Sequence, residues 1–87
     1  MKLQQHPLEG AQPRDHVLRV LREKGVSIEA YGERPDWYLV TDLDDTPEVI
    51  KLTDPVRSQM IVWLWRRFGE LHEFSFKDLQ APRPAAN

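Results

Sequence analysis

The sequence lacks cysteine altogether, so neither disulfide bonds nor thiolate metal ligands can stabilise the fold. It also lacks a long hydrophobic run. The longest uninterrupted apolar stretch is residues 60–65, which is far too short to span a bilayer. The first residues do not show the basic-then-apolar pattern of a secretory signal. We therefore expect a cytoplasmic protein without a membrane-spanning segment.

An excess of one charge sign is absent as well, because 12 basic and 14 acidic side chains leave a formal net charge of −2. This balance provides no overall attraction to nucleic acid or to an anionic membrane. The contents of 40% apolar and 30% charged residues are typical of a globular chain. We expect a flexible arm over residues 1–12, a single α+β domain with a small core over 13–80, and a disordered tail over 81–87.

The first predicted helix spans residues 13–24. Pro13 suits the first helical turn, and Asp15 there complements the helix dipole. Apolar residues recur at helical spacing and predict one buried face. Gly25 is placed to take the left-handed position that ends the helix, with Val26 packing back in a Schellman motif.

Three strand-like runs follow, over residues 26–31, 37–41 and 48–53. The turns between them are short, which favours an antiparallel meander because parallel strands need a longer crossover. In the first run apolar and polar residues alternate, so one face is expected to be buried and one exposed to solvent. The middle run is apolar on both faces. The exposed face of the sheet is expected to carry Ser27, Glu29, Tyr31, Lys51 and either Trp37 or Tyr38.

A second helix is predicted from Asp54 as its cap and Pro55 as its first residue, ending at Gly69. Its buried face is expected to comprise Val56, Met60, Trp63, Leu64 and Phe68. Ser75 and Asp78 have capping-box spacing, which predicts a short last helix. The fold class is therefore α+β: helix, three-stranded antiparallel β-meander, helix and short C-terminal helix, with the helices packed on one face of the sheet.

An apolar strand followed by Asp-x-Asp-x-Thr occupies residues 38–46, and it resembles the first motif of the haloacid-dehalogenase phosphatases. The resemblance implies Asp42 as nucleophile and Asp44 as acid/base, with magnesium between them. The family's crossover helices, lysine and distal acidic ligands have no counterpart, so a magnesium-dependent phosphatase is a remote alternative to an aspartate-rich turn. Residues 42–48 also lack the spacing of a calcium loop, and the histidines are scattered, so no metal or cofactor is predicted.

Basic side chains on the two long helices suggest an alternative function. The order helix, three strands, helix is similar in topology to double-stranded-RNA-binding domains and HicA-type toxins. The Gly-Ser-His element of HicA-type ribonucleases is replaced here by Gly-Glu-Arg-Pro at residues 32–35, so ribonuclease activity is not predicted. A nucleic-acid-binding regulator would need its basic residues on one surface. The candidates are Arg19, Arg22, Lys24, Arg57 and Arg67.

The second helix holds more apolar surface than one core-facing stripe needs. Trp63 is expected in the core, whereas Trp65 points away from it and is either covered by residues 74–79 or exposed. A Trp–Arg patch is typical of protein interfaces. We therefore predict a non-catalytic module that binds another protein or its own copy as a homodimer. The interface candidates are Val62, Trp65 and Arg66 on the helix, with Tyr31 and Tyr38 on the exposed side of the sheet.

Overall fold

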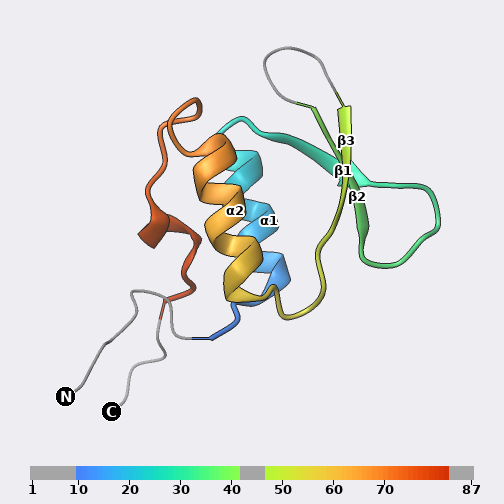
Figure 1. The fold of residues 1–87 in the computed structure, drawn as a ribbon, viewed down its shortest axis with the longest axis horizontal. Helices are drawn as coiled ribbons and strands as arrows, with labels where there is room; N and C mark the ends of the chain where they lie inside the picture. Colours follow the sequence, from blue (N-terminus) through green and yellow to red (C-terminus); the bar gives the residue numbers. More distant parts are fainter. Residues whose placement is uncertain (1–9, 42–46, 83–87) are drawn as a thin grey trace.

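A computed structural model describes residues 10–41 and 47–82 (Figure 1). The predicted α+β class and the predicted order of elements are confirmed. The elements are α1 (Arg14–Glu23), β1 (Ser27–Ala30), β2 (Trp37–Thr41), β3 (Pro47–Lys51), α2 (Ser58–Phe68) and the 3₁₀ helix η1 (Phe76–Leu79).

Three layers make up the described part of the chain. The antiparallel sheet has the order β1-β2-β3, and α1 and α2 lie side by side on one of its faces (Figure 1). The short helix η1 packs against α1 and α2 on their other side, away from the sheet, so the helices form the middle layer. No described element lies on the second face of the sheet in either ribbon view. None of the described helices is long and apolar enough to cross a membrane.

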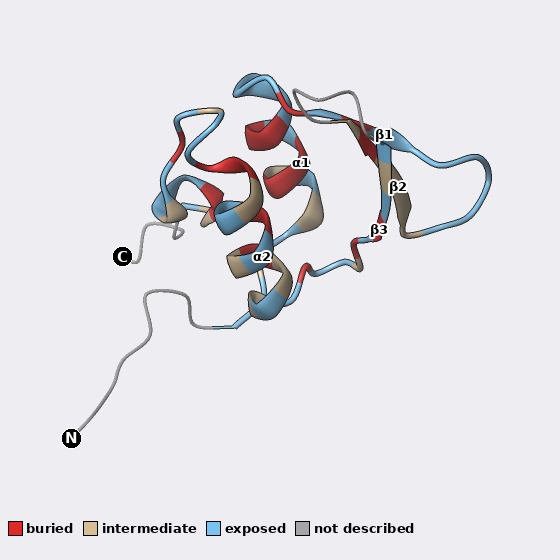
Figure 2. Ribbon diagram, turned by 45° about the horizontal axis from the view of Figure 1, so that its top comes forward, coloured by how far each residue is buried: buried red, intermediate tan, exposed pale blue. Residues whose placement is uncertain are grey.

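The core lies between the sheet and the helices and continues beneath η1, as the buried segments of Figure 2 show. Helical spacing brings Ile61, Leu64 and Phe68 onto the inner face of α2. Ile28, Val40 and Ile50 line up across the strands because their register makes them direct neighbours or diagonal ones on the same face. The remaining buried hydrophobic residues are Val17, Leu18, Val20, Leu21, Val26, Leu52, Val56, Phe74 and Leu79.

The predicted end of α1 is confirmed. Gly25 has φ of 96°, a conformation that suits glycine because it has no Cβ. The N–H of Gly25 donates to Arg22 and the N–H of Val26 donates to Leu21, which is the bond pair of a Schellman motif. Val26 is thereby buried against the helix it follows.

The predicted start of the second helix is wrong. α2 begins at Ser58, with Arg57 as its N-cap residue, instead of at Pro55. Residue 56 instead pairs with the chain near the N-terminus: Val56 and Gln12 exchange two main-chain hydrogen bonds of 2.8 and 2.9 Å. Asp54 caps the other helix, because its Oδ1 accepts a hydrogen bond from the Arg14 N–H at the start of α1. Pro13 has no side chain that can supply this bond.

Arg14 ties three segments together. Its Nη1 donates to Oδ1 of Asp36 at 2.6 Å and to the carbonyl of Leu52 at 2.8 Å, and its guanidinium lies 5.9 Å from the centre of the Tyr38 ring. The hydrogen bond to Asp36 raises the pKa of Arg14. These contacts fix the start of α1, the turn before β2 and the chain that leaves β3 in one arrangement.

The C-terminal segment is held by polar bonds as well as by Phe74 and Leu79. The predicted capping box is present, with the Ser75 N–H donating to Asp78 at 2.8 Å. His16 Nε2 lies 3.2 Å from the Asp78 carbonyl, and His72 Nδ1 lies 3.2 Å from the Lys24 carbonyl at the end of α1. His16 and His72 therefore each connect α1 to the C-terminal segment through a main-chain carbonyl.

The capping box predicts a pH dependence of stability. The N–H of Ser75, and then its hydroxyl, lower the pKa of Asp78 below its usual value. The unfolded chain then binds this proton first as the pH falls, so Asp78 stabilises the fold above about pH 4 and less below it. We expect Asp78→Asn to be less stable than the unmodified protein in urea at pH 7, and the difference to shrink by pH 3. A difference that grew on acidification would contradict the assignment.

Candidate functional site

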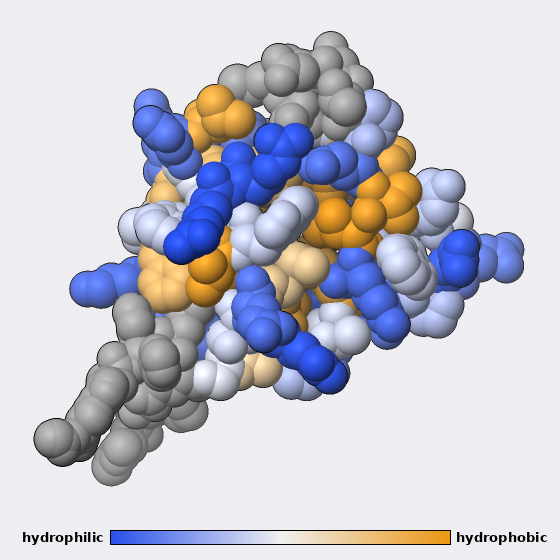
Figure 3. Space-filling model, in the orientation of Figure 1, coloured by the Kyte–Doolittle hydropathy of each residue, from blue (hydrophilic) through white to orange (hydrophobic). Residues whose placement is uncertain are grey.

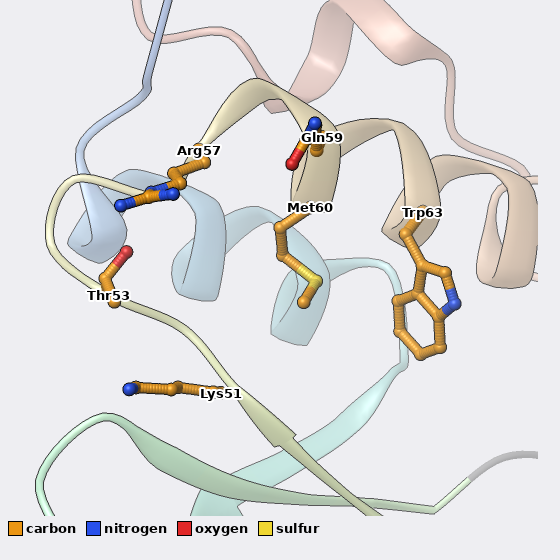
Figure 4. Close-up of a pocket in the computed structure, with 6 residues that line it drawn as sticks. All are labelled: Lys51, Thr53, Arg57, Gln59, Met60 and Trp63. Atoms are coloured by element: carbon orange, nitrogen blue, oxygen red, sulfur yellow. The ribbon is translucent and has the colours of Figure 1, made fainter.

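A groove of about 430 Å³ separates the first half of α2 from β3 and the chain that follows it (Figure 4). Figure 4 shows β3 as the strand nearest to α2 and shows the chain turning upward after Thr53 to enter the helix, so this turn closes one end of the groove. The residues that line it are Lys51, Thr53, Arg57, Gln59, Met60 and Trp63.

The closed end of the groove is basic. The hydroxyl of Thr53 and the guanidinium of Arg57 lie at this end, and the side chain of Lys51 extends from β3 on the side away from α2 (Figure 4). Neither cation forms an ion pair with any residue that the structure describes. Lys51 Nζ lies 5.9 Å from the centre of the Trp37 ring. This cation–π contact holds the ammonium in place but does not neutralise its charge. The closed end is therefore suited to an anionic group.

The other half of the groove is apolar. The thioether of Met60 and the indole of Trp63 point from α2 toward the strand (Figure 4). Trp63 is 36% exposed, and its edge-to-face contact with Phe68 has a centroid distance of 6.1 Å. The expectation that Trp63 belongs to the core is thus wrong, because it lies on the flank of α2 and forms a wall of the groove.

The edge of β3 beside the groove has main-chain groups that no residue of 10–41 or 47–82 pairs with. Leu52 N–H donates to the Asp36 carbonyl at 2.7 Å, and hydrogen-bonded pairs alternate along an antiparallel ladder. Ile50 and Glu48 therefore also bond to β2. Val49 and Lys51 direct their N–H and C=O groups away from it, and no described main-chain group pairs with them. An unpaired edge of this kind is a template for another strand.

An ion pair holds α2 beside this strand. Arg67 Nε and Nη2 each lie 3.1 Å from Oε1 of Glu48, and both side chains are about one-third exposed. Arg67 and Glu48 come from α2 and β3 respectively, so the pair links the two elements that form the walls of the groove.

The three interface candidates on α2 lie elsewhere. Trp65 is 38% exposed and packs edge-on against Phe76, with ring centres 5.3 Å apart, so the C-terminal segment covers it in part. Val62 is half-buried and Arg66 is exposed. Trp65 and Arg66 line a hollow of about 310 Å³ at the end of α2, together with Gly69, Glu70 and Phe74.

The two tyrosines predicted on the exposed side of the sheet are on different faces. Tyr31 is exposed, as predicted. The placement of Tyr38 is wrong: it is directly opposite Ile50, packs against the core and lies under Arg14. Trp37 takes the outer face instead, in line with Leu39. Hydrophobic side chains gather over the region of the sheet in the space-filling view (Figure 3).

The basic candidates for nucleic-acid binding make separate contacts with different groups. Arg19 approaches His16, Arg22 donates to the Ile28 carbonyl, and Arg67 pairs with Glu48. Arg19 and Arg22 line a hollow with Asp15 and Glu23, so acidic groups accompany them. Arg57 alone of these candidates belongs to the groove.

The phosphatase-like motif falls largely outside the described residues, which exclude Asp42 and Asp44. Within residues 10–41 and 47–82, no three histidine, aspartate or glutamate side chains gather where a metal ion could bind.

The sequence interpretation missed the roles of Lys51, Met60 and Trp63. A helix that begins at Pro55 would include Val56, and Val56 would turn the centre of its buried face toward Trp63. Because Val56 precedes the helix, Ile61, Leu64 and Phe68 define that face instead. The available signal was a pair of cations, Lys51 and Arg57, on either side of the short link between strand and helix.

Comparison with known proteins identifies no relative. No family model matches this chain, and no curated protein or solved structure is detectably similar to it.

Proposed function

We propose that this chain is a protein-binding module that accepts an extended segment of a partner along the free edge of β3. The observation that carries the proposal is the unpaired edge at Val49 and Lys51, which lies beside a groove with a basic end and an apolar wall. Main-chain bonds to a sheet edge supply affinity in strand addition, and side-chain pockets beside the edge supply specificity.

The side chains beside the edge favour an acidic segment with apolar residues. Lys51 and Arg57 attract carboxylates, whereas Met60 and Trp63 offer contact area to an apolar side chain. A segment in β conformation alternates its side chains between two faces. One set therefore points toward α2, and the other remains in solvent.

Residue 49 allows strand addition to be tested without damage to the sheet. Proline lacks an N–H, but position 49 does not use its N–H in the ladder with β2, so Val49→Pro should retain the fold. Val49→Ala is the matched control, because it also loses the valine side chain but keeps the N–H. We expect peptides of about ten residues, selected on the unmodified protein from random libraries, to bind Val49→Pro at least tenfold more weakly than Val49→Ala.

Three results would contradict the proposal. One is equal peptide affinity of the two variants, with both shown to be folded by circular dichroism. Another is the failure of any peptide to be selected. The third is steeply salt-dependent binding of a labelled single-stranded RNA of about 20 nucleotides that Arg57→Glu abolishes, since this would assign the basic end to phosphate groups.

A further inference from the structure

We infer that the strand added to this edge is β3 of a second copy of the chain, and that the two copies pair their β3 strands in an antiparallel, two-fold symmetric arrangement. This pairing rests on the proposed strand addition and specifies the partner. It follows from the difference between the two edges of the sheet, from the free main-chain groups and charges of β3, and from the position of Trp63.

The two edges of the sheet differ in how far the chain itself protects them. At the edge formed by β1, Arg22 of α1 donates from its Nε to the carbonyl of Ile28 at 3.1 Å. A side chain of the neighbouring helix thus covers a main-chain group of this edge, which hinders the addition of another strand. At the opposite edge, no described residue bonds to the free main-chain groups of Val49 and Lys51. β3 is therefore the edge that is open to a partner.

A pair of β3 strands would protect the open edge of both copies at once. The three strands of each copy would form one continuous antiparallel sheet, with β1 and its Arg22 contact at both outer edges. The same surface is used by each copy, so the interface is closed and a third copy cannot add in the same way. A second copy thus removes the exposed edge without leading to a fibre.

The free groups of β3 select one register for the pair. When Ile50 lies opposite Ile50 of the second copy, Val49 of each strand lies opposite Lys51 of the other. Every free N–H and C=O of Val49 and Lys51 then has a partner. A shift toward the start of β3 would place Lys51 opposite Pro47, which has no N–H. A shift toward its end would place the two lysines directly opposite each other, which is destabilising.

The charges of β3 agree with an antiparallel pair. Its acidic residue, Glu48, lies near the start of the strand, and its basic residue, Lys51, lies at the end. In the antiparallel pair the acidic start of each strand lies beside the basic end of the other, and the opposite charges attract. A parallel pair in register would place like charges side by side instead.

Trp63 adds apolar surface close to the two-fold axis. Arg67 pairs with Glu48 near the start of β3, whereas Arg57 follows the chain that leaves its end, so α2 runs antiparallel to β3. Trp63 lies between these two arginines on α2 and is therefore level with the middle of β3, where the axis passes. It is 36% exposed on the wall of the groove. In the pair the two indoles lie on either side of the axis, where the second copy shields them from water.

Sedimentation velocity of the full chain at about 1 µM to 1 mM tests this pairing. We expect a dimer whose population rises with concentration. Val49→Pro removes the N–H that donates to Lys51 of the second copy, whereas Val49→Ala retains it. We therefore expect Val49→Pro to dimerise about tenfold or more weakly than Val49→Ala. Circular dichroism checks that both variants are folded.

Single cysteines test the register, because the chain has none of its own. In the pair, residue 49 lies directly opposite residue 51 of the second copy with Cα atoms about 5.5 Å apart, within reach of a disulfide. Two copies of the same residue are diagonal neighbours about 7–8 Å apart, which is too far. We expect a mild oxidant to link a mixture of Val49→Cys and Lys51→Cys into mixed dimers, and to link each variant with itself far less.

The outcomes separate this pairing from the proposed function. A chain that stays monomeric, while selected peptides still bind Val49→Pro more weakly than Val49→Ala, would overturn the pairing and leave strand addition standing. A dimer of equal stability in the two variants would place the contact elsewhere and also overturn the pairing. So would self-linking of Val49→Cys as efficient as linking of the mixture. A monomer whose two variants bind peptides equally would overturn both proposals.

Discussion

Arg57→Glu is expected to weaken peptide binding by roughly ten- to hundredfold and to leave the free energy of unfolding nearly unchanged. The substitution puts a negative charge at the basic end of the groove, where the partner's carboxylate is expected, and reduces the attraction by about 1.4–2.8 kcal/mol. Arg57 is exposed and precedes α2, where an acidic side chain complements the helix dipole, so the fold has no reason to lose stability. Isothermal titration calorimetry and urea unfolding measure the two quantities.

Arg66→Glu is the matched control for this prediction. Arg66 is also an exposed arginine, but it lies in α2 beside Trp65, at the opposite end of the helix from Arg57. The change in net charge is identical in the two variants. An equal loss of affinity in both would show that overall charge, rather than the groove, governs binding.

Phe68→Ala is expected to leave little or no folded protein at 25 °C. Phe68, the last residue of α2, is fully buried between the helices and the C-terminal segment. Its ring is in edge-to-face contact with Trp63, and its ring centre lies 6.2 Å from that of His72. Truncation of a buried phenylalanine costs about 3–5 kcal/mol, which equals nearly the whole stability of a domain at the lower end of the usual range of about 5–15 kcal/mol, where a core this small belongs. Far-ultraviolet circular dichroism during urea titration would show a low or missing transition midpoint.

Leu71→Ala provides the comparison for Phe68→Ala. Leu71 is three residues further along and is 50% exposed, so its truncation creates no cavity and should change stability by about 0.5 kcal/mol or less. If Phe68→Ala were as mild as Leu71→Ala, the core between α2 and the C-terminal segment would be described incorrectly.

The sequence correctly predicted the parts of the fold whose hydrogen bonds join residues that are close in sequence. The Schellman motif at Gly25 and the capping box of Ser75 and Asp78 each lie within a few residues of sequence, and both are present. The antiparallel meander followed from short connections in the same way. In these cases tertiary packing agrees with local preference.

The wrong predictions concern residues whose partners are distant in the sequence. Asp54 has the chemistry of an N-cap, and it caps α1, which precedes it by 40 residues, instead of the helix that follows it. Tyr38 and Trp37 alternate in one strand, and sequence alone did not decide which side the helices cover. The groove has the same origin, because its lining residues from β3 and α2 face one groove only once the helix lies beside the strand.

A nuclear magnetic resonance titration of ¹⁵N-labelled protein with a selected peptide tests strand addition at the groove. Bound peptide is expected to shift the amide signals of Val49 and Lys51 and the indole signal of Trp63. It should also slow hydrogen exchange at the two amides, because both N–H groups then donate to the added strand. Shifts confined to Val62, Trp65 and Arg66, or to Tyr31 and the outer face of the sheet, with exchange at Val49 and Lys51 unchanged, would contradict binding along β3.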